Sequence, residues 1–244
     1  MIRHLLAAAI FTTSAFALSD RELDSIGAKV WKNECDGTRE GLTSWNGGEA
    51  FASLGIGHFI WYPAGGSGPF EESFPALVEF LFKSGVKLPA WLKSGMPCPW
   101  KTKAEFEADA QSPRMKELRA MLAGSIREQS RFLARRMENA LPKLLAATDK
   151  RGVEAKFKAL LATGAGTYAL IDYVNFKGEG TNAKERYKGE GWGLLQVLEG
   201  MEGDSSKDFG ASAARVLTRR VENSDPARNE RKWLPGWLNR VRAY

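Results

Sequence analysis

The residues best suited to chemistry lie near the N-terminus, where one acid is followed by glycines and a histidine. Glu34 closes a helical pattern over residues 20–33, and the tetrad Gly-Ile-Gly-His occupies 55–58. Cleavage of a glycosidic bond needs a carboxylic acid that protonates the leaving oxygen, and usually a second carboxylate that acts on water or sugar. Val30 and Trp31 on the preceding turn, together with the helix C-terminus, would favour a protonated Glu34. We therefore expect Glu34 to be a general acid.

A second carboxylate is expected between Glu34 and the tetrad, where three acids are available: Asp36, Glu40 and Glu49. Asp36 falls on the turn that leaves the helix. Glu49 follows the turn signal Asn-Gly-Gly at 46–48, and alternation places Glu49, Phe51 and Ser53 on one face of a strand. We expect Glu49 to activate water or to stabilise charge, with Ser53 helping to place the water. If no second carboxylate faces the cleft, Glu34 alone still serves a lytic transglycosylase.

Sugar-binding subsites need aromatic faces together with amide and hydroxyl groups. The candidates are His58, Trp61, Tyr62, Tyr168, Asn175, Tyr187 and Gln196. Asn175 and Tyr187 are preferred because they flank a glycine-rich loop, while core packing is the alternative for each aromatic residue. His58 is either a proton carrier or a buried histidine that holds the surroundings of the carboxylate, and Asp172 is a cleft acid or a structural partner of an arginine. With two histidines in the whole chain, a zinc site is not expected, and neither is any other metal or cofactor.

The elements that position these residues are mostly helical. A capping-box pattern at Ser19 and Glu22 opens the first helix, and residues 37–48 cannot continue it because they are rich in glycine, serine and asparagine. Residues 50–61 indicate short extended segments. Later helices are expected over 71–84, from Lys103 after a capping-box pattern at Thr102 and Glu105, from Pro113 after Ser112, and over 125–147, 150–163, 167–178, 189–202 and 207–223. The predicted fold class is α+β and mostly helical, one domain with a small β-hairpin lobe near its N-terminus.

The first seventeen residues are expected to be a secretory signal peptide. Arg3 precedes an apolar run, and Ala15-Phe16-Ala17 offers small residues around a cut; an uncleaved anchor is the alternative. Residues 18–244 would form the exported protein, periplasmic or secreted. Removing Arg3 lowers the formal net charge from +6 to +5, which suits an anionic polymer or serves solubility. Cys35 and Cys98 are either one disulfide or two buried thiols.

Three patches of the sequence resemble the lysozyme-like superfamily, most closely the phage-type lysozymes, or endolysins, which are muramidases. Those enzymes place a catalytic Glu at the end of an N-terminal helix, and a β-lobe follows that ends in a strand with Gly-Ile-Gly-His. Ser53 stands where the family carries Thr or Ser. Residues 168–180 resemble the family's core helix, which borders the sugar-binding cleft, and 234–244 resemble its C-terminal Gly-Leu-x-x-Arg-Arg segment, with Trp and Val among the replacements.

The resemblance covers about 70 of the residues from 18 to 244, and residues 64–165 match nothing in it, which makes them a candidate helical elaboration. The family usually carries an Asp where this chain offers Glu49. The resemblance implies an exported monomeric enzyme that cleaves β-1,4 bonds between the aminosugars of peptidoglycan glycan strands. The alternatives are a lytic transglycosylase, a hydrolase of deacetylated or chitin-like glycans, and a non-catalytic wall-binding protein. Nucleic acid is not an expected partner, and neither is a membrane once the leader is removed.

Overall fold

The first helix forms as its sequence predicts and places Glu34 in its last turn. The computed structural model describes residues 18–68 and 70–244, so the expected leader at 1–17 lies outside the described residues. α1 (Asp20–Cys35) starts at Ser19, whose side chain accepts a hydrogen bond from the Glu22 backbone while the Glu22 carboxylate accepts one from Ser19 N at 2.8 Å. It ends at Asp36, which adopts a left-handed conformation (φ 53°). The predicted capping box and helix are confirmed.

The β-lobe follows immediately as a small antiparallel sheet. A 3₁₀ turn, η1 (Glu40–Leu42), leads into β1 (Thr43–Ser44), β2 (Ala52–Leu54) and β3 (Phe59–Trp61), which pair in the order β1-β2-β3. The family pattern implies that the Gly-Ile-Gly-His tetrad lies in a strand. Here the tetrad instead forms the turn between β2 and β3. Gly55 (φ 72°) and His58 (φ 48°) both have left-handed backbone conformations. Four residues are therefore enough to reverse the chain and to turn His58 toward α1.

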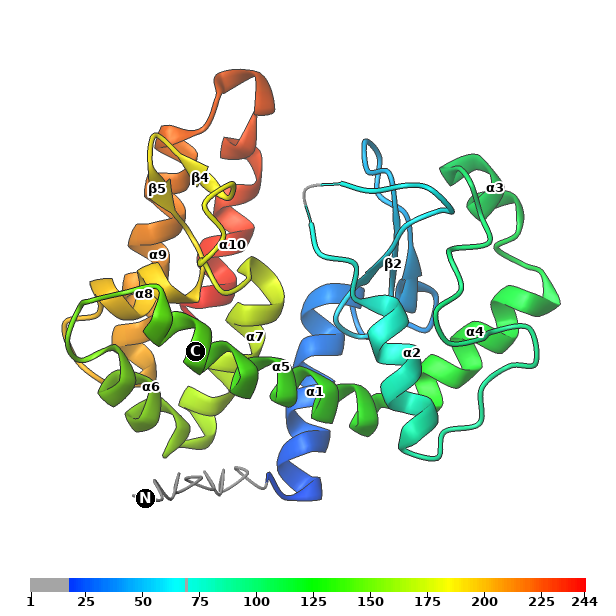
Figure 1. Ribbon diagram of the computed structural model, residues 1–244, viewed down its shortest axis with the longest axis horizontal. Coiled ribbons are helices and arrows are strands. Elements are labelled where there is room, and N and C mark those ends of the chain that lie inside the picture. The colour runs from blue at the N-terminus through cyan, green and yellow to red at the C-terminus, as the bar shows by residue number, and fades with distance from the viewer. Residues whose placement is uncertain (1–17, 69) are drawn as a thin grey trace, which may run out of the picture.

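Three helices pack on the same side of the molecule as the sheet, as Figure 1 shows. They are α2 (Phe74–Lys83), α3 (Lys103–Ala108) and α4 (Pro113–Gly124). The predicted caps at Thr102 and Ser112 are confirmed, since each side chain accepts a hydrogen bond from the backbone three residues later. These helices and the β-lobe share one apolar core, in which Trp61 packs against Phe74 and Trp100.

A long helix, α5 (Ile126–Ala146), joins this half to a mostly helical half and packs against α1 (Figure 1). The close approach of the two helices depends on Gly27, because a Cβ there would lie 2.4 Å from Ser130 Oγ. The helical half contains α6 (Val153–Leu161), α7 (Gly164–Lys177), α8 (Leu194–Gly200), α9 (Ser206–Asn223) and α10 (Leu234–Val241). Two 3₁₀ turns, η2 (Pro226–Arg228) and η3 (Glu230–Trp233), connect α9 to α10. The α+β, mostly helical class is confirmed.

One helix is shorter than its sequence pattern predicts. Instead of a helix over 189–202, a hairpin of β4 (Arg186–Tyr187) and β5 (Glu190–Gly191) precedes α8. Lys188 (φ 49°) and Gly189 (φ 82°) both adopt left-handed conformations at its tip, which is the geometry of a tight hairpin turn. Within the described residues, no helix has the length and apolarity that a bilayer crossing needs.

The two cysteines do not form a disulfide. Cys35 and Cys98 are both free and buried. The Cys35 thiol donates to the Gly55 carbonyl at 3.5 Å, whereas Cys98 N donates to the Tyr62 carbonyl at the end of β3. Of the two alternatives that the sequence leaves open, the structure has the pair of buried thiols.

Candidate active site

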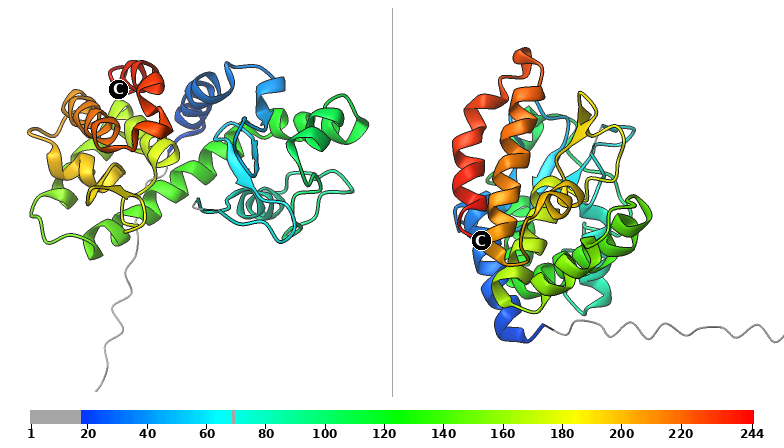
Figure 2. Two further views of the ribbon diagram at one scale, coloured as in Figure 1. Left: turned by 90° about the horizontal axis from the view of Figure 1, so that it is seen from above. Right: turned by 90° about the vertical axis from the view of Figure 1, so that its left-hand side faces the viewer.

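The Glu34 carboxylate lies where α1 meets both halves of the molecule. Its side chain is 16% exposed, so it is sheltered but still open to solvent. Oε1 accepts a hydrogen bond from Arg240 Nη2 at 2.6 Å, and Oε2 lies 3.7 Å from His58 Nδ1. Seen from above in Figure 2, α10 (red), which carries Arg240, lies next to α1 (blue), and the Arg240–Glu34 hydrogen bond joins the two helices. The surroundings of Glu34 are thus charged on one side, instead of the apolar pocket that Val30 and Trp31 suggest.

Arg240 is itself held by a buried acid. Asp172, on α7, is fully buried and accepts from Arg240 Nε at 2.8 Å and from Nη2 at 2.7 Å. Burial on its own would lower the pKa of the Arg240 guanidinium, but the Asp172 hydrogen bonds and the charges of Glu34 and Asp172 hold that pKa well above its usual range. Of its two interpretations, Asp172 is therefore the structural partner of an arginine.

Tyr244 completes this network. Its hydroxyl donates to Asp172 Oδ2 at 2.5 Å, and burial together with the Asp172 charge raises the pKa of that hydroxyl well above its usual value. The tyrosine therefore stays protonated and acts as a donor. Neither Arg240 nor Tyr244 is predicted as a site residue. The resemblance of 234–244 to a family segment is the one signal in the sequence that points toward them.

His58 faces Glu34 from the turn between β2 and β3. Its Nε2 lies 3.2 Å from the Gly41 carbonyl oxygen. A carbonyl oxygen only accepts, so Nε2 must carry a proton. A neutral His58 then presents an unprotonated Nδ1 to Glu34 Oε2, and a doubly protonated one pairs with the carboxylate. The ring is held across the lobe, as the structural interpretation expects, and it also lies beside the candidate acid.

Glu49 is the acid of the β-lobe that the structure associates with His58. It is half-buried in the turn before β2, and Asn46 Nδ2 donates to its Oε2 at 3.1 Å. Burial raises the pKa of Glu49, while the Asn46 hydrogen bond and the charge of His58 oppose that rise. His58 is therefore close enough for its charge to act on Glu49. Asp36 and Glu40, by contrast, are both exposed.

The strand argument that favoured Glu49 is wrong in detail. β2 begins only at Ala52, so the alternation does not extend back to Glu49, and Glu49, Phe51 and Ser53 do not share one strand face. Ser53 is 4% exposed and pairs with Ser44 and Ile60 in the middle of the sheet. A serine in this position is part of the lobe's interior and is poorly placed to hold a reacting water.

Three of the predicted sugar-binding aromatics belong to the interior. Trp61 is 1% exposed and donates to the Met96 carbonyl at 3.0 Å; Tyr62 is also buried, and its hydroxyl donates to the Phe70 carbonyl. The buried Tyr168 accepts a hydrogen bond from Asn33 at 2.8 Å. For Trp61, Tyr62 and Tyr168 the core-packing alternative is correct, because a buried ring has no free face for a sugar.

The other candidates lie at the inner edge of the helical half. Asn175 Nδ2 donates to the Gly57 carbonyl at 3.1 Å, which ties α7 to the tetrad. The Tyr187 hydroxyl donates to Glu230 at 2.8 Å, and its ring lies 4.5 Å from that of Trp192. Gln196 is buried and holds the loop at Gly180 and Gly193. Asn175 thus braces the site from the helical half, and the partly exposed Tyr187 stays a candidate.

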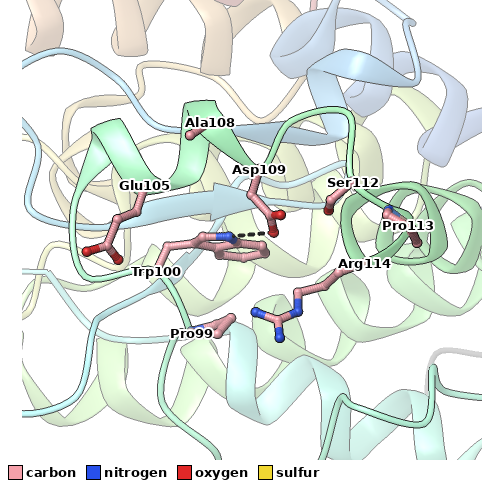
Figure 3. A pocket seen from close by; sticks show the side chains of 8 residues that line it. All are labelled: Pro99, Trp100, Glu105, Ala108, Asp109, Ser112, Pro113 and Arg114. Atoms are coloured by element: carbon pink, nitrogen blue, oxygen red, sulfur yellow. Dashed lines mark hydrogen bonds between the residues drawn. The ribbon is translucent and has the colours of Figure 1, made fainter.

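A separate shallow pocket of about 610 Å³ lies beside α3 and α4, and Figure 3 shows its lining. Trp100 forms its floor and donates to Asp109 Oδ2 at 2.9 Å. Arg114 projects from the start of α4. The pocket is lined by none of the candidate residues around Glu34, so it lies apart from the candidate site.

Comparisons of this chain with family models, curated proteins and solved structures found no match.

Proposed function

We propose that this protein is a glycosidase that cleaves the β-1,4 bonds between aminosugars in peptidoglycan, with Glu34 as the proton donor. The observation that carries this proposal is the asymmetric environment of the Glu34 carboxyl group. Oε1 is fixed by Arg240 at 2.6 Å, while Oε2 faces His58 at 3.7 Å and the group is still partly exposed. One oxygen is thereby anchored, and the other can present a proton to a substrate oxygen that comes within hydrogen-bond reach.

The reaction begins when the proton on Oε2 passes to the glycosidic oxygen and the bond to the anomeric carbon breaks. Glu34 becomes a carboxylate at this moment, and the Arg240 guanidinium already in contact with it stabilises the new charge. Because Asp172 and Tyr244 hold Arg240 in place, little reorganisation is needed. A doubly protonated His58, whose Nδ1 lies 3.7 Å from Oε2, is positioned to return a proton to Glu34 for the next cycle.

Glu49 is the preferred partner for the second half of the reaction. Water must add its hydroxyl to the anomeric carbon and give up its remaining proton, for which a carboxylate on the other side of the sugar is the usual base. The half-buried position of Glu49 near His58 suits this role better than the exposed Asp36 or Glu40. If the substrate's own hydroxyl attacks instead, the product carries an anhydro end and Glu49 is not required.

The substrate lies outside the cytoplasmic membrane, so the function requires export. The predicted leader at 1–17 would supply the route, and the mature chain would act in the periplasm or after secretion. Its positive formal charge complements a wall polymer that carries carboxylates.

The test is the rate at which Glu34→Gln releases soluble fragments from purified sacculi. The amide keeps an oxygen that can accept from Arg240, so the fold should persist, while loss of the proton donor should lower the rate by about 10² to 10⁴. Glu40→Gln is the matched control because it removes an exposed acid from the neighbouring lobe. Undiminished release by Glu34→Gln would refute the mechanism.

The products of the wild-type protein separate the remaining alternatives. Mass spectrometry distinguishes hydrolysed ends from anhydro ends, and parallel digests of acetylated and deacetylated glycans identify the preferred sugar. Binding to sacculi without any release of fragments would support the non-catalytic alternative.

A further inference from the structure

A row of cationic and aromatic side chains extends outward from Glu34 along α7 and α10. The Arg240 guanidinium, which contacts Glu34, lies 4.2 Å from the centre of the Phe176 ring. The Lys177 ammonium lies 3.8 Å from that ring and 3.6 Å from the Trp237 ring. The chain of contacts is continuous from the candidate acid to Trp237.

The row ends at an exposed tryptophan. Trp233 stacks on Trp237 with ring centres 6.2 Å apart and an interplanar angle of 27°. Trp233 is 46% exposed, which is unusual for so large an apolar side chain in this protein. The ammonium of Lys232 lies over the Trp233 ring, 4.6 Å from its centre, but this lysine is exposed and its side chain can move aside for the apolar face of a sugar.

Lys177 differs from Arg220 and Arg240 because it has no acidic partner. Arg220 makes a two-point ion pair with Glu230 at 2.8 and 3.0 Å, and Arg240 pairs with Glu34 and Asp172. Among residues 18–68 and 70–244, Lys177 forms no ion pair. Burial lowers the pKa of Lys177 well below its usual value, and the charges of Arg220 and Arg240 lower it further, although Glu230 and Glu34 oppose this.

A cation that is desolvated and placed between two arginines is unfavourable for the isolated protein. An anion bound beside it would relieve that cost. Protonation of Glu34, which the proposed reaction requires, removes one negative charge from the cluster and makes it more attractive to an anion. The position of Lys177 therefore indicates a ligand that carries its own negative charge.

We infer that Trp233 and Lys177 form an outer subsite for a carboxylate-bearing glycan, in which the sugar stacks on Trp233 and its carboxylate pairs with Lys177. This inference rests on the proposed function, which places the scissile bond at Glu34 and so lets the glycan extend outward past Trp237 to Trp233. In peptidoglycan, the carboxylates belong to the lactyl substituent and the stem peptide. A neutral β-1,4-linked hexosamine chain would use the tryptophan but not the lysine.

The experiment measures binding by calorimetry in a Glu34→Gln background, so that no substrate is consumed. The probes are a soluble muropeptide that carries free carboxylates and a neutral chitin oligomer of similar length. Lys177→Met keeps an unbranched apolar side chain and removes the charge. It should weaken muropeptide binding about tenfold, which corresponds to about 1.4 kcal/mol, and leave chitin binding unchanged.

Two further variants complete the design. Trp233→Ala should weaken binding of both probes, because it removes the shared stacking surface. Lys207→Met removes an exposed lysine from α9 and is the control for net charge. Melting temperatures of all variants separate a binding defect from a folding defect, and Lys177→Met should not melt below the parent protein.

The outcomes distinguish this inference from the proposed function. If sacculi are cleaved but Lys177→Met binds the muropeptide as tightly as its parent does, the subsite is refuted and the glycosidase proposal stands. If no substrate is cleaved but binding depends on Lys177 and Trp233, the subsite stands and the catalytic proposal fails. Equal losses of both probes in Lys177→Met would also overturn the inference, because a charge-specific contact cannot act on a neutral glycan.

Discussion

Replacing Asp172 by asparagine should cost this protein a large part of its stability. Three donors converge on the Asp172 carboxylate: Arg240 Nε and Nη2 at 2.8 and 2.7 Å, and the Tyr244 hydroxyl at 2.5 Å. Asparagine has the same shape but only one oxygen, so at least one donor must face an amide NH₂ group. The side chain is fully buried, and water cannot replace the missing acceptor.

The expected loss follows from the charge that is left behind. Removing one partner of a buried ion pair typically costs about 3–5 kcal/mol, because the remaining charge stays buried and incompletely compensated. Glu34 still contacts Arg240 in the variant and keeps the loss toward the lower end. For a chain of this size, about 3 kcal/mol corresponds to a fall in melting temperature of roughly 6–12 °C.

The measurement is urea unfolding followed by tryptophan fluorescence, with the midpoint and slope fitted for each protein. Asp204→Asn is the matched control, because it makes the same substitution at an exposed position; it should change the unfolding free energy by less than about 0.5 kcal/mol. A loss of under about 1 kcal/mol in Asp172→Asn would show that Arg240 does not depend on this acid, and the account of how the site is held would then be wrong.

Three other perturbations test separate parts of the structure. Gly57→Ala should lower the free energy of unfolding, measured in urea, by about 1–3 kcal/mol, because the new Cβ would lie 2.9 Å from Asn175 Oδ1 on α7. Gly47→Ala is the control, because a Cβ at that position meets nothing within 4 Å. Lys177→Met should be more stable than wild type, and the difference should widen as the pH falls below about 10. The folded pKa of the lysine lies below its unfolded value, so wild type loses stability as the unfolded chain takes up the proton first. A constant difference across that range would contradict the cause given for the shift. Burial and nearby acids raise the pKa of the Cys35 thiol to about 12, and burial raises the pKa of the Cys98 thiol to about 12. Both thiols should therefore resist a thiol reagent at neutral pH until the protein unfolds. Rapid labelling of the native protein would contradict their burial.

The parts of the fold that depend on short stretches of sequence could be predicted. The caps at Ser19, Thr102 and Ser112 are local hydrogen bonds between residues three positions apart, and all three form. The position of Glu34 at a helix end follows from the same reasoning. The hairpin at 186–191 was missed because its strands have two residues each, too few for any periodicity to appear.

The contacts that complete the candidate site could not be predicted, because they join distant parts of the chain. Arg240 lies 206 positions from Glu34, and no local pattern links the two. The unpaired state of Lys177 is a property of its neighbours on other helices and is invisible in its own sequence surroundings. Aromatic residues such as Trp61 are ambiguous for another reason: the residue type alone does not show whether a ring is exposed to a sugar or buried in the core.

The bond between Arg240 and Glu34 also constrains when the candidate site can assemble during folding. Among the contacts that the described residues make around Glu34, this one joins the positions that are farthest apart in the sequence. The entropic cost of closing so long a loop must be overcome before the carboxyl group is anchored. Individual helices form much earlier than such a contact. A refolding chain should therefore regain its helical circular dichroism before the Arg240–Glu34 contact forms, and, under the proposed function, before it can cleave a glycan.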